Sequence, residues 1–230
     1  MKWVFDMGSS TKQDILNAAE LLFAEHGFGD TSLRAITTKA EVNLAAVNYH
    51  FGSKKQLIQE VLKRYLDVMM PEVDKQVAAM LAKNPQPGMP QVFGTLITPL
   101  LLLNKVRPAG TSIFVRLLGR GYSETQGHLR KYIMFHWGEV LKRFVDAVHL
   151  AAPDLPPSEL FWRLHFAIGT FVFTMASSKA LCEISAADYD QPVDVAGIIN
   201  RLIPYISAGT AAPVAASVTT ITSTPTLDIA

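Results

Sequence analysis

Apolar residues recur at helical spacing along nearly the whole chain, and this pattern constrains the fold more than any other feature of the sequence. No segment shows the sustained apolar–polar alternation of a β-strand. The spacing and the helix-ending residues predict helices over residues 10–27, 31–40, 44–50, 53–71, an amphipathic segment to 83, and then 91–105, 111–124, 127–150, 158–183 and 193–208. The expected fold class is therefore all-α.

Composition excludes several classes of protein. The 230 residues are 49% apolar, which is enough for one core or for a small domain docked on a larger one. The net charge is only +1, so any DNA-binding surface must be local. The single cysteine, Cys182, excludes an internal disulfide and a multi-cysteine metal site. No apolar run has the length of a signal peptide or a membrane span, so we expect a cytoplasmic protein without membrane contact. Met7 is an alternative translation start.

Loop-forming residues divide the chain into parts. We expect a helix-turn-helix domain at 9–54 and a helical ligand-binding and dimerisation domain at 55–208. Residues 209–230, mostly Ala, Thr, Ser, Val and Pro, are predicted to be a disordered tail. The long helix 158–183, together with 193–208, is the predicted two-fold interface, because small residues alternate there with bulky ones.

Two short helices joined by a tight turn at Glu41 and Val42 indicate a helix-turn-helix motif. Asp30 or Thr31 is the predicted cap of the first of them, and Asn43 that of the second. The start of its second helix fits a major groove about 12 Å wide. The residues predicted to face base edges are Asn43, Leu44, Ala45, Ala46 and Asn48. Those predicted to contact phosphates are Thr31, Ser32, Arg34, Tyr49, His50, Lys54 and Lys55. Residues 31–55 hold four Lys or Arg against one Glu, a local net charge of +3. The preceding acidic residues, Glu20, Glu25 and Asp30, are expected on a surface that faces away from the duplex.

The stretches 31–36, 40–43 and 47–57, including Tyr49-His50-Phe51 with Lys54 three residues later, resemble the signature of the TetR family of transcriptional regulators. The resemblance covers about 50 residues and implies that the remaining helices bind a ligand and dimerise. Glu41 stands where the family usually has glycine. A non-glycine residue with positive φ costs about 1 kcal/mol, so the turn either carries that strain or is built differently.

Segments 116–119, 126–132 and 155–163 resemble the PsrA-type subgroup, whose members respond to long-chain fatty acids. The resemblance implies an acyl effector, which needs an apolar cavity with a polar group at its mouth. The predicted lining residues are Phe114, Leu118, Trp162 and Phe166, and the predicted polar ones are Arg116, Arg120, Tyr122 and His165. The alternative for the apolar residues is core or dimer interface, and for the arginines a surface ion pair.

We therefore expect a homodimeric repressor that binds a palindromic double-stranded DNA operator and is released by a fatty acid or acyl-CoA. One alternative is an activator or an unliganded DNA-binding protein of the same fold. Another is a lipid-binding or enzymatic helical protein with an incidental helix-turn-helix. The enzyme interpretation is disfavoured because the sequence has no nucleophile elbow, phosphate loop, dinucleotide fingerprint or two-histidine zinc spacing; no cofactor or metal is expected.

Overall fold

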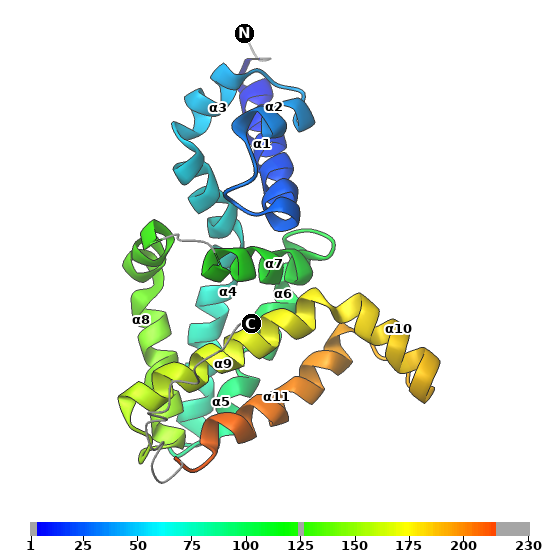
Figure 1. Cartoon of the computed structure of the whole chain (residues 1–230). Helices are drawn as coiled ribbons and strands as arrows, with labels where there is room; N and C mark the ends of the chain where they lie inside the picture. Colours follow the sequence, from blue (N-terminus) through cyan, green and yellow to red (C-terminus); the bar gives the residue numbers. More distant parts are fainter. Residues whose placement is uncertain (1–3, 124–126, 215–230) are drawn as a thin grey trace, which may run out of the picture.

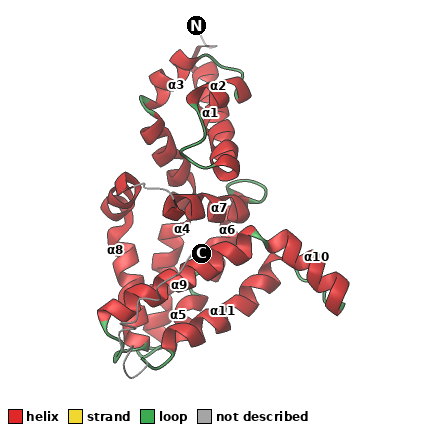
Figure 2. Ribbon diagram, in the orientation of Figure 1, coloured by secondary structure: helices red, strands yellow, loops and turns green. Residues whose placement is uncertain are grey.

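The computed structural model describes residues 4–123 and 127–214, which contain helices and turns and no strand (Figures 1 and 2). The helices are α1 (Val4–His26), α2 (Leu33–Lys39), α3 (Leu44–Phe51), α4 (Lys54–Lys83), α5 (Met89–Gly94), α6 (Ile97–Leu102), the short 3-10 helix η1 (Leu103–Lys105), α7 (Gly110–Ser123), α8 (Gly127–Ala151), α9 (Pro157–Ala176), α10 (Ser178–Tyr189) and α11 (Val195–Ala211). The all-α prediction is confirmed.

Helices α1 to α3 form one end of the molecule, here called the head, and α4 leads from it into the remaining helices, here called the body (Figure 1). Within the body α9 and α11 lie side by side, while α10 projects outward and buries none of its residues. No single described helix has the length and apolar composition of a membrane span. Only α9 and α10 taken together meet that criterion, and they are bent by 69°.

Two apolar clusters form the core. One joins the head to α7 and to the first halves of α4 and α8, with Phe23, Ile36, Leu57 and Leu117 among its fully buried members. The other joins the ends of α4 and α8 to α5, α9 and α11. Since α4 contributes to both clusters, it is packed along its length rather than exposed as a linker.

The structure corrects the predicted end of the fourth helix. A stop was expected at Pro71, but α4 continues through it to Lys83, for a total length of 30 residues. Proline inside a helix removes one backbone hydrogen bond and costs about 3 kcal/mol. Leu66 and Met70 before it and Val73 and Val77 after it are all buried, so packing on both sides offsets that cost.

Other predicted boundaries also shift. The first helix begins at Val4 rather than near residue 10, and the predicted helix 91–105 is divided at Thr95–Leu96 into α5 and α6. The predicted helix 158–183 is broken at Ser177 into α9 and α10. The last helix continues to Ala211, three residues into the predicted tail, and residues 215–230 of that tail lie outside the described residues.

Candidate nucleic-acid interface

The three head helices are held together by large apolar side chains. Ile15 and Phe23 of α1, Ile36 of α2 and Val47 of α3 are all completely buried. Burying each of these side chains contributes about 1.5–3 kcal/mol to the free energy of folding. Because Val47 faces this core, the opposite face of α3 is directed away from the head.

Side-chain caps fix where the head helices begin. The Ser32 hydroxyl accepts from the Ala35 amide at 3.0 Å, so Ser32 caps α2 rather than the predicted Asp30 or Thr31. Asn43 caps α3, as predicted, through a 2.9 Å bond from the Ala46 amide to its side-chain oxygen. The Ser53 hydroxyl likewise accepts from the amide of Gln56 at 3.2 Å. These bonds satisfy amides that would otherwise lack partners.

Glu41 keeps the positive φ of the turn, at 56°. The turn therefore has the left-handed conformation for which glycine is the usual residue, and the Glu41 backbone carries the strain. Val42, the next residue, packs against the head core and holds the turn in place.

The outward face of α3 is largely free of intramolecular contacts. Leu44, Ala45 and Asn48 are exposed, and Tyr49 is 85% exposed although it is a large aromatic residue. Ala46 is half-buried, and Asn43 remains exposed while it caps the helix. Such a face combines small side chains, which permit close approach, with amide and phenol groups that can hydrogen-bond to base edges or phosphates.

Cationic side chains flank this face. Arg34 and Lys55 are exposed and form no ion pair within residues 4–123 and 127–214, and neither does Lys39. The Lys54 ammonium donates to the Gly29 carbonyl at 3.0 Å, and His50 is half-buried against Tyr49. Unpaired cations beside an exposed helix can neutralise phosphate charges.

Thr31 is a correction to the predicted set of phosphate contacts. Its side chain is buried, and its hydroxyl donates within 3.1 Å of the Leu22 carbonyl and 2.7 Å of the Gly27 carbonyl. It therefore closes the α1–α2 connection and is not available to a phosphate, whereas its neighbour Ser32 is exposed.

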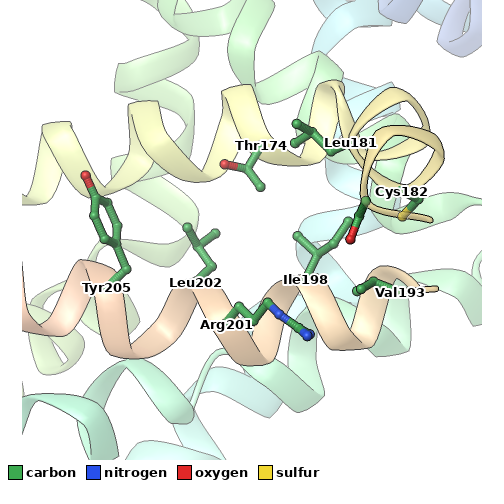
Figure 3. A pocket seen from close by; sticks show the side chains of 9 residues that line it. Thr174, Leu181, Cys182, Val193, Ile198, Arg201, Leu202 and Tyr205 are labelled. Carbon is green, nitrogen blue, oxygen red and sulfur yellow. The ribbon is translucent and has the colours of Figure 1, made fainter. Parts of the chain in front are cut away.

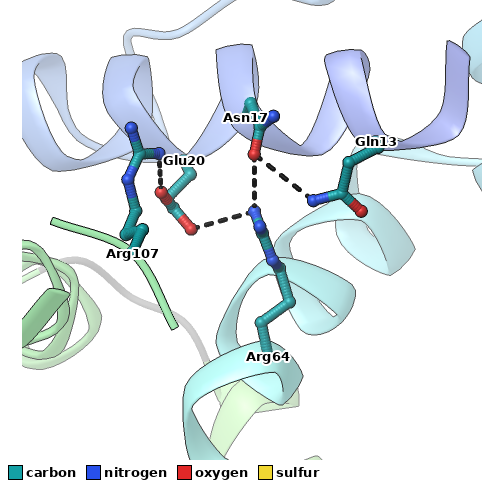
Figure 4. A network of polar contacts seen from close by, with 5 residues as sticks. All are labelled: Gln13, Asn17, Glu20, Arg64 and Arg107. Atoms are coloured by element: carbon teal, nitrogen blue, oxygen red, sulfur yellow. Dashed lines mark hydrogen bonds and ion pairs between the residues drawn. The ribbon is translucent and has the colours of Figure 1, made fainter. Parts of the chain in front are cut away.

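One charged residue that sequence reasoning placed at the surface is completely buried. The Glu20 carboxylate of α1 has 0% exposure and binds two arginines, Arg64 of α4 at 3.1 Å and Arg107 of the segment before α7 (Figure 4). Burial, and then the nearby Glu20 charge, raise the pKa of the Tyr65 hydroxyl above its usual value. The burial of Glu20 could have been recognised from its position, because it lies on the apolar face of α1, four residues after Leu16.

The residues predicted to bind the effector do not surround one cavity. Phe114 is buried in the core with its ring 5.6 Å from that of Tyr65. Arg120 donates to the Glu25 carbonyl at 2.8 Å, and Tyr122 lies edge-on to His165 at 5.8 Å. Arg116 and Leu118 are half-buried on α7, and Trp162 and Phe166 lie stacked, 6.1 Å apart, on the exposed face of α9.

The structure has a hollow elsewhere, between α9, α10 and α11 (Figure 3). Its volume is about 290 Å³, and none of the eight predicted effector residues lines it. Its wall is mainly apolar, with Arg201 and Tyr205 as its large polar side chains; the lining residues are Thr174, Leu181, Cys182, Ser185, Val193, Ile198, Arg201, Leu202 and Tyr205.

Comparison with known families accounts for both parts of this architecture. The family described as "Bacterial regulatory proteins, tetR family" matches residues 15–61, and "Tetracyclin repressor-like, C-terminal domain" matches residues 94–209. The second match alone spans half of the chain. The chain belongs to the TetR family of transcriptional regulators. The predicted fatty-acid subgroup is a finer assignment that these matches do not contain.

Curated relatives match only a short part of the chain. The probable HTH-type transcriptional regulator YttP of Bacillus subtilis is 36% identical over 61 residues, which are 26% of this chain and 30% of that protein. The HTH-type transcriptional repressor Rv3405c of Mycobacterium tuberculosis is 50% identical over 48 residues, 21% of this chain and 26% of that protein. The aligned region therefore spans less than a third of these relatives.

Solved structures extend the likeness to the whole fold. A HlyIIR mutant protein superposes with a TM-score of 0.53 at 20% identity, covering 86% of this chain and 96% of that one. A TetR-like transcriptional regulator from Rhodococcus sp. RHA1 gives a TM-score of 0.53 at 18% identity, covering 88% and 97%. At these identities the likeness establishes the TetR fold alone.

Proposed function

We propose that the protein is a homodimeric repressor that inserts α3 into the major grooves of a palindromic DNA operator and is released by a small amphipathic effector. The observation that carries the proposal is the outward face of α3. Tyr49 and Asn48 are exposed there, beside Arg34 and Lys55, for which the described part of the chain supplies no ion-pair partner. A two-turn helix reads few bases, so two half-sites, bound by a dimer, are needed for useful specificity.

The proposed dimer surface is the outward face of α9, defined as Trp162, Phe166, Gly169, Phe173 and Ala176. All five are exposed, and they are spaced alternately four and three residues apart, which is the seam spacing of packed helices. Phe166 and Phe173 are 63% and 68% exposed. Contiguous exposed aromatic residues of this kind mark a protein interface. Helix α11, beside α9, completes the proposed four-helix contact.

The test of DNA binding is selection of duplexes from a random library, followed by gel-shift titration of the selected duplex at several salt concentrations. Lys55→Ala is expected to remove about one phosphate contact, which reduces the slope of log binding constant against log salt concentration by about 0.9. Tyr49→Phe is expected to weaken binding. Lys83→Ala, at the far end of α4, is the control and should change neither. Failure of the wild-type protein to enrich any duplex would refute the proposal.

For the effector we propose a fatty acid or acyl-CoA. The proposal is supported by the subgroup resemblance of residues 116–119, 126–132 and 155–163 and by the apolar hollow, where Arg201 lies beside Leu202 and Ile198 (Figure 3). A volume of 290 Å³ is at the lower limit of ligand pockets, roughly 300–1,000 Å³, so it admits only part of a long acyl chain. Release of operator DNA by hexadecanoate or its CoA thioester, and not by hexadecanol, is the expected result. Retained operator affinity across the panel would favour the alternative, an activator or unliganded DNA-binding protein.

A further inference from the structure

The head is attached to the body by more than the chain connection into α4. Glu20, in the second half of α1, is paired on one side with Arg64 and on the other with Arg107 (Figure 4). Arg64 belongs to α4, directly after the head in sequence, and it also donates to Asn17 at 3.1 Å. Arg107 is 87 residues away from Glu20, in the segment between η1 and α7. The two arginines therefore hold the same carboxylate from two different parts of the body.

The segment that carries Arg107 is tightly built. Ala109 has a φ of 60°, and a Cβ added at Gly110 would lie 2.0 Å from the Leu103 carbonyl oxygen. The buried Thr111 hydroxyl donates to the Leu100 carbonyl at 2.6 Å. A segment fixed in this way presents the Arg107 guanidinium at one position relative to the body, so its ion pair with Glu20 constrains the orientation of α1.

Helix α7 makes a second contact with α1 at its other end. There the Arg120 guanidinium donates to the Glu25 carbonyl at 2.8 Å. Helix α7 packs against α1 in the head and also against α9 in the body (Figure 1). Besides α4, which continues directly from the head, α7 is therefore a second element that touches both the head and the body.

We infer that Arg107 is a positioning residue for operator binding: through Glu20 it fixes the angle between head and body and thereby the separation of the two α3 helices in a dimer. This inference rests on the proposed function. It gives the two arginines different roles. Arg64 secures α1 against its own sequence neighbour α4, whereas Arg107 links the Glu20 carboxylate to the segment that leads into α7. Loss of Arg107 would leave α3 and its DNA-contacting face unchanged but widen the range of head positions.

The test uses the duplex selected by the wild-type protein and versions with one or two base pairs added to or removed from the spacer, each of which moves the half-sites by about 3.4 Å per base pair. Wild type should prefer its own spacer by at least about tenfold. Arg107→Met should reduce that preference to about threefold or less, and Arg107→Lys should restore most of it. Arg64→Met and Arg143→Met, the latter removing a body ion pair with Asp74, should keep the wild-type spacer preference.

A second measurement follows head position without DNA. Spin labels at Lys39→Cys and Lys83→Cys in a Cys182→Ser background report an intrachain distance between head and body. Arg107→Met should broaden that distance distribution, and Arg107→Lys should not. A merely destabilising effect would lower affinity equally for all spacers and leave the distribution narrow, which would overturn the inference. If wild type selects no duplex, the proposed function fails while the distance measurement still decides the role of Arg107.

Discussion

Replacing Glu20 with Gln is the sharpest test of how the head is held. The substitution keeps the size of the side chain but removes the charge that Arg64 and Arg107 share. Removing one partner of a buried ion pair costs about 3–5 kcal/mol, because the remaining charge stays desolvated. Here the arginine side chains are 18% and 25% exposed and can partly turn toward water. We therefore expect a loss of roughly 2–3 kcal/mol in the free energy of unfolding.

Thermal unfolding followed by circular dichroism measures this loss. For a chain of this size it corresponds to a melting temperature lower by about 4–12 °C, compared at equal protein concentration because a dimer's stability depends on it. The matched control is Asp146→Asn, which breaks the exposed pair with Lys142 and should leave the melting temperature close to that of the wild type. If Glu20→Gln unfolds at the wild-type temperature, the buried carboxylate does not secure the head, and the reasoning is wrong.

Three further predictions test other parts of the structure. Gly110→Ala should destabilise the protein by about 1–3 kcal/mol, since its Cβ meets a backbone oxygen, whereas Gly94→Ala, with nothing within 4 Å, should be neutral or stabilising in the same melt. Phe166→Asp should convert a dimer to a monomer in sedimentation velocity, whereas Phe135→Asp, on an even more exposed phenylalanine of α8, should not; if the Phe166→Asp protein also remains dimeric, the assigned interface is wrong. Glu41→Gly should raise stability by roughly 1 kcal/mol by relieving the positive φ, and a lower melting temperature would contradict that strain.

The head was predictable because its signals are local. Asn43 and Ser53 cap helices within three residues of themselves, and the apolar stripe of α1 follows from i, i+3 and i+4 spacing alone. The positions that failed were those whose partners are not local. Thr31 was interpreted as exposed, yet its hydroxyl binds a carbonyl nine residues earlier, and Glu20 was interpreted as surface charge, yet one of its partners is 87 residues away.

The sequence by itself determined the helical class, the helix-turn-helix and the side chains presented by α3, because spacing and capping act over one or two turns. Tertiary structure alone decided that α4 runs through Pro71, that the helix after Pro157 breaks at Ser177, and that Glu20 is buried between two arginines. In each case the deciding free energy comes from distant side chains. Burial on both sides outweighs a proline, and two cations make a buried carboxylate tolerable.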